Sequence, residues 1–301
     1  MMMMPDDIAK KIKNISLDDA IDDFIRLQSI DLEETSPLSR IGLKFLDYFF
    51  FVERLSTVGA KGISFFSFLE DFEIHRKKSA SINRLYEQLR YKHPTNFTKC
   101  IKEIFQLYFG SINAFRPIVA MNIYERYRPK NVLNVCSGWS GFLIAASAIN
   151  VPKITAIDSN KNLLEPYTNM IQELKKYSSS EITFINGNAL TVDISKVGYD
   201  LLICSPPYYN KEIYAHMPPP YNTKKEWSES FYKPLFKRVW EHLEVNGRMV
   251  INVPIEIYDK CLVPLFGEAD DKILLPKYRR NNKYQEFIYI WVKSNERLMN
   301  Y

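Results

Sequence analysis

In the first third of the chain, hydrophobic residues recur at intervals of three and four positions, which is the spacing of one buried helix face. The ranges that follow this spacing most clearly are 20–27, 41–55 and 82–91. Ser16 stands ahead of Asp18 and Asp19, and a hydroxyl followed by acidic first-turn residues is a typical helix start. We therefore interpret residues 1–113 as a helical region.

Beyond residue 130 the pattern changes to short β-branched runs that alternate with segments of helical spacing. The predicted strands are 131–136, 153–157, 182–185, 199–204, 248–253, 272–275 and 287–292, and the predicted helices are 139–149, 163–177 and 225–243. Buried strands that alternate with helices specify a parallel sheet covered on both faces. The polar run 279–283 predicts an antiparallel hairpin for the last two strands. We predict an α/β fold with a seven-stranded sheet in residues 114–301, onto which the helical region docks.

The amino-acid composition excludes several classes of protein. With 46% hydrophobic residues, 25% charged residues and only 10 glycines, the chain is neither collagen-like nor of low complexity. The apolar run 45–52 is interrupted by Asp47 and is too short for a membrane helix, and the amino terminus lacks the features of a secretory signal. We expect a soluble, cytoplasmic protein. The four cysteines and four histidines are dispersed, so we predict neither a disulfide framework nor a metal site.

Polar and small residues follow the predicted strands at the positions where an open parallel sheet binds its ligands. The first strand leads into a turn that contains Gly138 and Gly141, which allow a ligand to approach the backbone and its free amides. Asp158 ends the second strand, where a carboxylate suits the two hydroxyls of a ribose. Asn188 follows the third strand and can meet an adenine edge. Together these residues predict an adenosine-type cofactor.

The fourth strand ends in Ser205-Pro206-Pro207-Tyr208. Successive prolines fix the backbone and remove two N–H donors, so that the carbonyls remain as acceptors. The Ser205 hydroxyl and the Pro206 carbonyl can accept the two hydrogens of an amino group, and Tyr208 can stack on a planar ring. The segment predicts a receptacle for a flat group that bears an NH2.

Residues 115–293 resemble class I S-adenosylmethionine-dependent methyltransferases that modify adenine N6 or cytosine N4. The likeness lies in Gly138-Trp139-Ser140-Gly141, Asp158, Asn188-Ala189 and Ser205-Pro206-Pro207-Tyr208; Phe115-Arg116-Pro117 and the run 205–214 resemble the DNA methylase-like proteins of phages and large DNA viruses. The resemblance implies a Rossmann-like methyltransferase domain over 114–301 with S-adenosylmethionine as cofactor. The cofactor residues that it implies are Phe115, Arg116, Asn134, Cys136, Gly138, Gly141, Asp158, Asn188 and Ala189.

The chain departs from this family at two positions. The family usually has an aspartate where this chain has Asn134, and a glycine where it has Ser140. Asn134 brings no charge for the ammonium of the cofactor, and Ser140 adds bulk beside it. These differences predict weakened cofactor binding.

The expected reaction is attack of an exocyclic amino nitrogen on the cofactor methyl group, with Ser205, Pro206, Pro207 and Tyr208 as the catalytic segment. Aromatic residues interleaved with lysines suit base stacking and phosphate contact; the predicted substrate residues of this kind are Tyr209, Tyr214 and Lys224. We expect nucleic acid, in the first place DNA, as partner, which agrees with the net charge of +5.

Several alternatives stay open. An RNA base or a protein glutamine also offers an amino group on a planar system, although glutamine enzymes typically have Asn where this chain has Ser205. A degenerate methyltransferase that acts as a nucleic-acid-binding or scaffold subunit is the third alternative. No large recognition domain follows the strands, so the helical region, a partner subunit or a homodimer contributes target recognition, or specificity is low.

Overall fold

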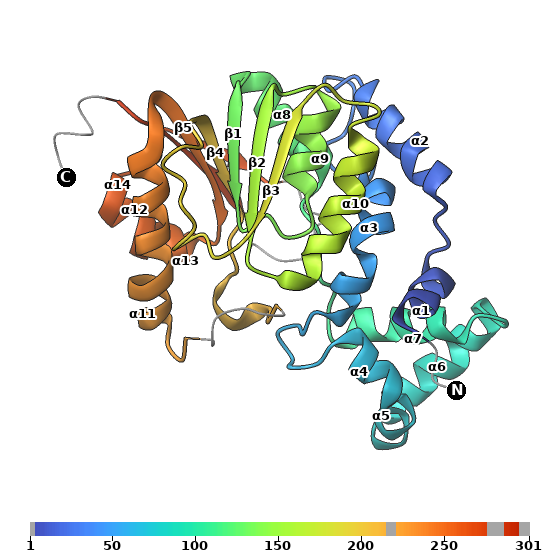
Figure 1. Ribbon diagram of the computed structural model, residues 1–301. Coiled ribbons are helices and arrows are strands. Elements are labelled where there is room, and N and C mark those ends of the chain that lie inside the picture. Colours follow the sequence, from blue (N-terminus) through green and yellow to red (C-terminus); the bar gives the residue numbers. More distant parts are fainter. Residues whose placement is uncertain (1–3, 215–220, 276–285, 295–301) are drawn as a thin grey trace.

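The computed structural model describes residues 4–214, 221–275 and 286–294 (Figure 1). Its centre is a seven-stranded sheet with the strand order β3-β2-β1-β4-β5-β7-β6. The strands are β1 (Asn131–Val135), β2 (Lys153–Asp158), β3 (Glu181–Asn186), β4 (Tyr199–Cys204), β5 (Leu243–Val253), β6 (Asp271–Leu274) and β7 (Phe287–Val292). All seven overlap the strands predicted from the sequence.

The pairing of the strands sets the position of the ligand site. Strands β1 to β5 pair with their neighbours in parallel, whereas β7 is antiparallel to both β5 and β6. The antiparallel arrangement of the last two strands is thus confirmed, although its predicted hairpin at 279–283 lies outside the described residues. From β1 the chain builds the sheet toward β3 on one side, and then toward β5 on the other. The order therefore reverses between β1 and β4, where open α/β sheets bind ligands.

Helices cover both faces of this sheet, and each face has its own core because successive strand residues point to opposite sides. Val132 belongs to the core under α8–α10, and Leu133 to the core under α12. The helices of the first layer are α8 (Pro117–Tyr127), α9 (Gly141–Ala148), η1 (Lys161–Leu163) and α10 (Leu164–Leu174). Those of the second layer and the loop before it are η2 (Tyr209–Lys211), α11 (Lys224–Trp227), η3 (Ser228–Tyr232), α12 (Lys233–His242), α13 (Ile255–Ile257), η4 (Tyr258–Leu262) and α14 (Val263–Phe266).

The amino-terminal residues are helical, as predicted, and they pack in two different cores. Their helices are α1 (Pro5–Ile12), α2 (Leu17–Gln28), α3 (Leu43–Ser56), α4 (Phe65–Glu70), α5 (Phe72–Lys78), α6 (Ala80–Lys92) and α7 (Phe97–Tyr108). Phe24 of α2 and Phe45 and Phe50 of α3 share one core with α8, α9 and α10. Helices α1 and α4–α7, with the outer face of α3, enclose a third core; we call these helices the lobe and their core the lobe core. In Figure 1 this lobe lies beyond the carboxyl ends of the strands.

Local chemistry explains how the first helices are joined. Ser16 and Asp19 form a reciprocal capping box at the start of α2, which confirms the predicted cap. The Asp23 carboxylate accepts the Lys44 amide at 2.7 Å and thus satisfies the start of α3 from the neighbouring helix. Gly42 stands directly before α3 and has a φ of +85°. A Cβ at this position would lie 2.9 Å from the Leu27 side chain of α2. Only glycine fits this crossing.

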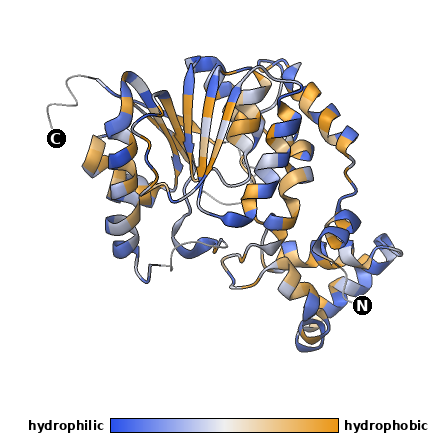
Figure 2. Ribbon diagram, viewed as in Figure 1, coloured by the Kyte–Doolittle hydropathy of each residue, from blue (hydrophilic) through white to orange (hydrophobic). Residues whose placement is uncertain are grey.

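Hydrophobic residues run along the strands and the inner faces of the helices (Figure 2). Within the described ranges, no helix has the length and apolar character that a membrane span needs. The four cysteines are free thiols.

Candidate active site

A cavity of about 1140 Å³ lies at the carboxyl ends of β1 and β4, and residues of α7 in the lobe form part of its lining. Most of the residues predicted for cofactor, catalysis and substrate line it. Those that do are Phe115, Arg116, Cys136, Gly138, Gly141, Asp158, Asn188, Ala189, Ser205, Pro206, Pro207, Tyr208 and Tyr214. The two halves of the predicted site therefore face one common space.

The turn after β1 is unusually bent. Cys136, Gly138 and Ser140 take left-handed φ values of +52°, +48° and +67°. Such a conformation is costly for a residue with a side chain and is typical of turns that are shaped for a ligand. A Cβ on Gly138 would meet no atom nearer than the Cys136 carbonyl oxygen at 4.0 Å, so the space beside this residue is open.

Gly141 has a different role from the one that its place in the turn suggested. A Cβ at this position would lie 2.2 Å from the Phe115 carbonyl oxygen. The Phe115 ring in turn packs on Phe142, with centroids 4.2 Å apart. The absence of a side chain at Gly141 thus lets the segment before α8 close onto the turn, which brings Phe115 and Arg116 to the cavity.

Asp158 connects the ends of three strands. One of its carboxylate oxygens accepts the Gly138 amide at 2.8 Å, and the other accepts the Asn160 amide at 2.9 Å. The Asn186 side-chain amide donates to the Asp158 carbonyl at 3.0 Å. Burial raises the pKa of the Asp158 carboxyl, and the amide hydrogen bonds oppose that rise. Each carboxylate oxygen keeps a second lone pair for a ligand hydroxyl.

The Ser-Pro-Pro-Tyr segment is held by a residue of the next strand. Asn252, at the end of β5, donates its side-chain amide to the Phe287 carbonyl at 3.0 Å, which fixes the direction of its Oδ1. Tyr208 Oη donates to this Oδ1 at 2.8 Å, and Ser205 Oγ lies 3.3 Å from it and 3.0 Å from Tyr208 Oη. Because the Ser205 proton has an acceptor inside the protein, the lone pairs of Ser205 Oγ can accept from a ligand.

Tyr232 supports the same segment from behind. Its hydroxyl donates to the Pro207 carbonyl at 2.7 Å and accepts the Tyr209 amide at 2.8 Å. Tyr209 itself has a φ of +54°, which is a strained conformation for a bulky residue. Tyr232 ends the single π turn between α11 and α12, and such turns are frequent at functional sites.

The structure places three predicted residues away from the cavity. Asn134 is fully buried in β1 and donates to the Ile203 carbonyl at 2.9 Å, a bond that an aspartate could not make. The Tyr209 ring packs in the core beside Tyr232, and Lys224 pairs on the surface with Glu256 at 2.6 Å. None of the three lines the cavity, because local spacing does not determine which way a side chain points at the end of a strand or in a loop.

Ser140 also requires a correction. Its side chain is fully buried and its hydroxyl lies 3.3 Å from the Met170 sulfur of α10. It does not line the cavity, so the expectation that its bulk stands beside the cofactor is not met. The departure from glycine is accommodated in the packing between the turn and α10.

Glu212 and Tyr214 form a pair on the cavity wall. Tyr214 Oη donates to the Glu212 carboxylate, and the Tyr214 ring lies 5.9 Å from that of Trp139 in the glycine turn. Burial raises the pKa of both side chains, while the Tyr214 hydrogen bond and the charge of Arg54 oppose the rise at Glu212. The segment after Tyr208 thereby reaches the turn after β1.

The lining has an excess of acidic groups. Among the described residues, the charged side chains on the wall are Glu103, Arg116, Asp158, Lys211, Glu212 and Glu286. Glu103 is paired with Lys92 at 3.0 Å, which leaves three carboxyls against two basic groups, so the cavity suits a ligand that carries a positive charge better than it suits a phosphate.

Sequence reasoning missed Asn252 and Tyr232, and although it allowed the helical region a part in target recognition, it named no residue there. Asn252 had a usable signal, since it is a polar residue at the carboxyl end of a predicted strand. Tyr232 had none, because it stands inside a helix and reaches Pro207 only through the packing of α11 and η3 against the sheet.

The sheet and its cavity define an α/β protein of the Rossmann-like class with a cavity at the switch point of the sheet. Neither a family model nor a curated protein matches the sequence. Among solved structures, the protein is similar to TrmN from Thermus thermophilus. The identity is 15% and the TM-score is 0.40, and the match covers 59% of this chain and 48% of the TrmN chain. It is also similar to a methyltransferase from Pyrococcus furiosus, with 18% identity and a TM-score of 0.40 over 64% of this chain and 94% of that one.

A further solved structure is NSun6 from Pyrococcus horikoshii with SFG, at 14% identity and a TM-score of 0.43. That match covers 61% of this chain and 53% of the NSun6 chain. The chain thus spans about half the length of both TrmN and NSun6.

Proposed function

We propose that the protein transfers a methyl group from S-adenosylmethionine to the exocyclic amino group of a nucleic-acid base, cytosine N4 or adenine N6 of DNA. The observation that carries this proposal is the shared cavity of the glycine turn after β1 and the Ser-Pro-Pro-Tyr segment after β4. A methyl donor and an amine acceptor must meet in one enclosed space, and these two segments stand on either side of the switch point.

The residues on the β1–β3 side fit the proposed cofactor. Asp158 retains lone pairs for two ribose hydroxyls, and the open space at Gly138 lets a ligand lie against the backbone. The acidic lining suits a sulfonium cation. Phe115 and Arg116, which also line the cavity, would contact the cofactor on this side. Asn134 is not among the proposed cofactor contacts because its side chain faces the core.

The residues on the β4 side fit a flat amine. Ser205 Oγ is left with acceptor lone pairs by its contacts to Asn252 and Tyr208, and the two prolines offer no competing N–H. Accepting both amino hydrogens at Ser205 and Pro206 would draw the amine out of the plane of its ring and make its lone pair available. Tyr208 would hold the ring by stacking.

When bound, S-adenosylmethionine supplies an electrophilic methyl group. The protein contributes orientation, since aligned reactants gain about 7–11 kcal/mol of the barrier. The amine proton becomes strongly acidic only after its nitrogen has gained the methyl group, so the reaction requires no strong base. In duplex DNA the base must leave the stack first, which costs a few kcal/mol.

Two measurements test the proposal. Calorimetry of the full chain with S-adenosylmethionine should detect binding, and methyl transfer from labelled cofactor to separate pools of DNA, RNA and protein should label DNA. Nucleoside mass spectrometry then identifies N4-methylcytosine or N6-methyladenine. Absence of cofactor binding at millimolar ligand would refute the proposed enzymatic activity and would favour the alternative of a degenerate methyltransferase that acts as a scaffold subunit. Label in RNA or protein alone would refute DNA as the substrate.

Variants of the segment separate chemistry from folding. Tyr208→Ala should abolish transfer with cofactor affinity nearly unchanged, because Tyr208 belongs to the amine side of the cavity. Tyr91→Ala is the matched control, since Tyr91 is 89% exposed on α6 and should leave transfer intact. Loss of both transfer and cofactor binding in Tyr208→Ala would point to misfolding, and unchanged transfer would exclude the proposed role.

The predicted partner subunit or homodimer stays a prediction.

A further inference from the structure

Helix α7 has two faces with different surroundings. Cys100, Ile101, Ile104 and Phe105 are buried in the lobe core. On the opposite side, Glu103, Gln106 and Leu107 line the cavity, at the three- and four-residue steps of one helix face, and Gly110 lines it from the turn after the helix. Ser111 and Asn113, which follow the helix, continue this lining. We call Gln106, Leu107, Ser111 and Asn113 the α7 wall.

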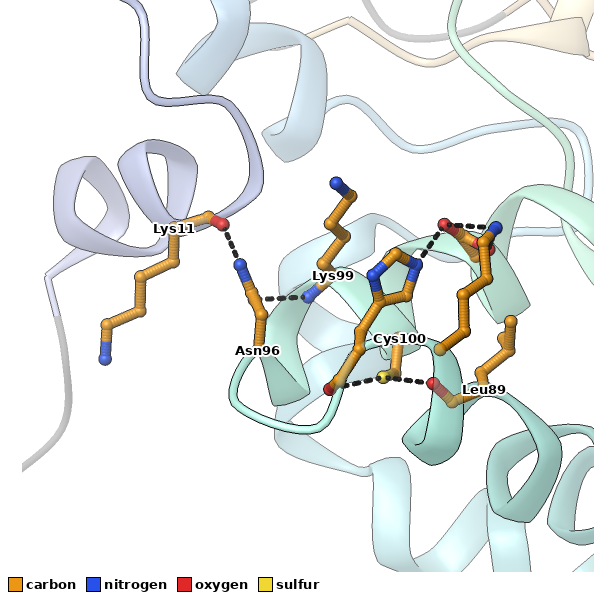
Figure 3. A network of polar contacts seen from close by, with 8 residues as sticks. Lys11, Leu89, Asn96, Lys99 and Cys100 are labelled. Atoms are coloured by element: carbon orange, nitrogen blue, oxygen red, sulfur yellow. Dashed lines mark hydrogen bonds and ion pairs between the residues drawn. The ribbon is translucent and has the colours of Figure 1, made fainter.

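The α7 wall stands on a fixed support. Asn96 caps α7 by accepting the Lys99 amide at 2.9 Å, and its own side-chain amide donates to the Lys11 carbonyl of α1 at 2.6 Å (Figure 3). The Cys100 thiol, on the buried face, points at the Leu89 carbonyl of α6 at 3.3 Å. Two helices of the lobe, α1 and α6, therefore hold α7 in one orientation.

The lobe is also tied to the amine side of the cavity. Val58, in the loop after α3, forms an antiparallel bridge with Ile213, whose amide donates to the Val58 carbonyl at 2.9 Å. Ile213 follows the Ser-Pro-Pro-Tyr segment by a few residues and stands between Glu212 and Tyr214. The α7 wall therefore lines the same cavity as the proposed amine receptacle, to which the lobe is joined by this bridge.

The chemistry of the wall favours bases over phosphates. Gln106 and Asn113 carry carboxamides, Ser111 a hydroxyl, and Leu107 is an apolar side chain that is 57% exposed. No lysine or arginine of residues 4–113 lines the cavity, and the one acidic group beside the wall, Glu103, is paired with Lys92 at 3.0 Å. Carboxamides bind base edges through paired donor and acceptor atoms, and apolar side chains contact base faces and methyl groups.

We propose that the α7 wall is the specificity surface of the enzyme and reads the bases next to the one that is methylated. This inference rests on the proposed function. It assigns the helical region a task in target recognition, with Gln106 and Asn113 as the residues that distinguish one neighbouring base from another. A good bidentate contact distinguishes bases by about tenfold or more.

The test uses the full chain, labelled S-adenosylmethionine and an oligonucleotide library in which a fixed target base is flanked by random positions. We expect the wild type to prefer particular neighbours, and Gln106→Ala and the Gln106→Ala/Asn113→Ala double variant to flatten that preference by about tenfold at one or two positions. Calorimetry should give unchanged affinity for S-adenosylmethionine. Gln88→Ala, at an exposed position of α6 outside the cavity, is the matched control and should keep the wild-type profile.

The outcomes separate this inference from the proposed function. A wild type that methylates the library, with the double variant showing the same profile, overturns the inference and upholds the proposed function. Loss of cofactor affinity in the double variant assigns the wall to the cofactor and overturns the inference as well, as does a wild-type profile without preference. A wild type that transfers no methyl group to any nucleic acid overturns both.

Discussion

Replacement of Tyr232 by phenylalanine removes one oxygen atom that joins two points of the catalytic segment. The hydroxyl of this fully buried residue donates to the Pro207 carbonyl at 2.7 Å and accepts the Tyr209 amide at 2.8 Å. The ring itself is retained in Tyr232→Phe, so its stacking on Trp227, with centroids 5.6 Å apart, is kept. The change therefore probes the hydrogen bonds alone.

The magnitude follows from the two groups that lose a partner. A buried polar group without a hydrogen bond costs about 1–3 kcal/mol. The hydrogen bond to the Pro207 carbonyl is partly buried, whereas the hydrogen bond from the Tyr209 amide is buried. We expect a loss of unfolding free energy on the order of 2 kcal/mol, most of it from the Tyr209 amide. Tyr209 holds a strained φ of +54°, so the segment should also shift when this bond is gone.

Methyl transfer is the more sensitive readout. A displacement of about 1 Å can lower a rate about 100-fold, so we expect kcat of Tyr232→Phe to fall at least tenfold, while calorimetry gives unchanged affinity for S-adenosylmethionine. Tyr199→Phe is the matched control. Tyr199 is also fully buried and donates one hydrogen bond, to the Val239 carbonyl at 2.6 Å, but it begins β4 at the far end from the cavity.

The control separates a loss of catalytic positioning from a general loss of stability. Urea unfolding should show a similar loss of stability in both variants, and only Tyr232→Phe should lose transfer. Equal activity in the two variants would refute the conclusion that Tyr232 positions the Ser-Pro-Pro-Tyr segment. Unchanged stability in Tyr232→Phe would refute the hydrogen bonds themselves.

Three further predictions concern the turn and the lobe. Gly141→Ala places a methyl group 2.2 Å from the Phe115 carbonyl oxygen, so it should lower cofactor affinity at least tenfold by calorimetry, whereas unchanged affinity would exclude this close packing. Ser140→Gly should leave cofactor affinity within twofold, because the Ser140 side chain contacts Met170 and not the cavity; a large gain would show that the serine obstructs the cofactor. Burial lowers the pKa of Lys102 to about 8, so the folded state binds its proton less tightly than the unfolded state does. The penalty that Lys102 places on wild-type stability should therefore shrink as pH rises between about 8 and 10.5, and Lys102→Met, which removes the buried charge, should be more stable than wild type at pH 7 by up to about 3 kcal/mol. Denaturant unfolding of both proteins at pH 7 and 10 checks this prediction. A difference in unfolding free energy between Lys102→Met and wild type that does not shrink as pH rises would contradict it.

The sequence by itself determined the elements and the end of the sheet that carries the site. Strand and helix periods are local properties of the chain, and the carboxyl ends of parallel strands share one edge whatever packs around them. Gly138, Asp158 and Ser205 could therefore be placed together from sequence, since each directly follows a buried apolar run.

Tertiary structure alone decided which side chains enter the cavity and what supports them. Asn134 faces a carbonyl of β4, and Tyr209 turns into the core, because the direction of a side chain at a strand end or in a tight turn depends on what packs against it. Asn252 and Tyr232 come from β5 and from a helix of the second layer, and the α7 wall comes from a separate part of the chain. These contacts join residues that are distant in sequence, and no local period encodes them.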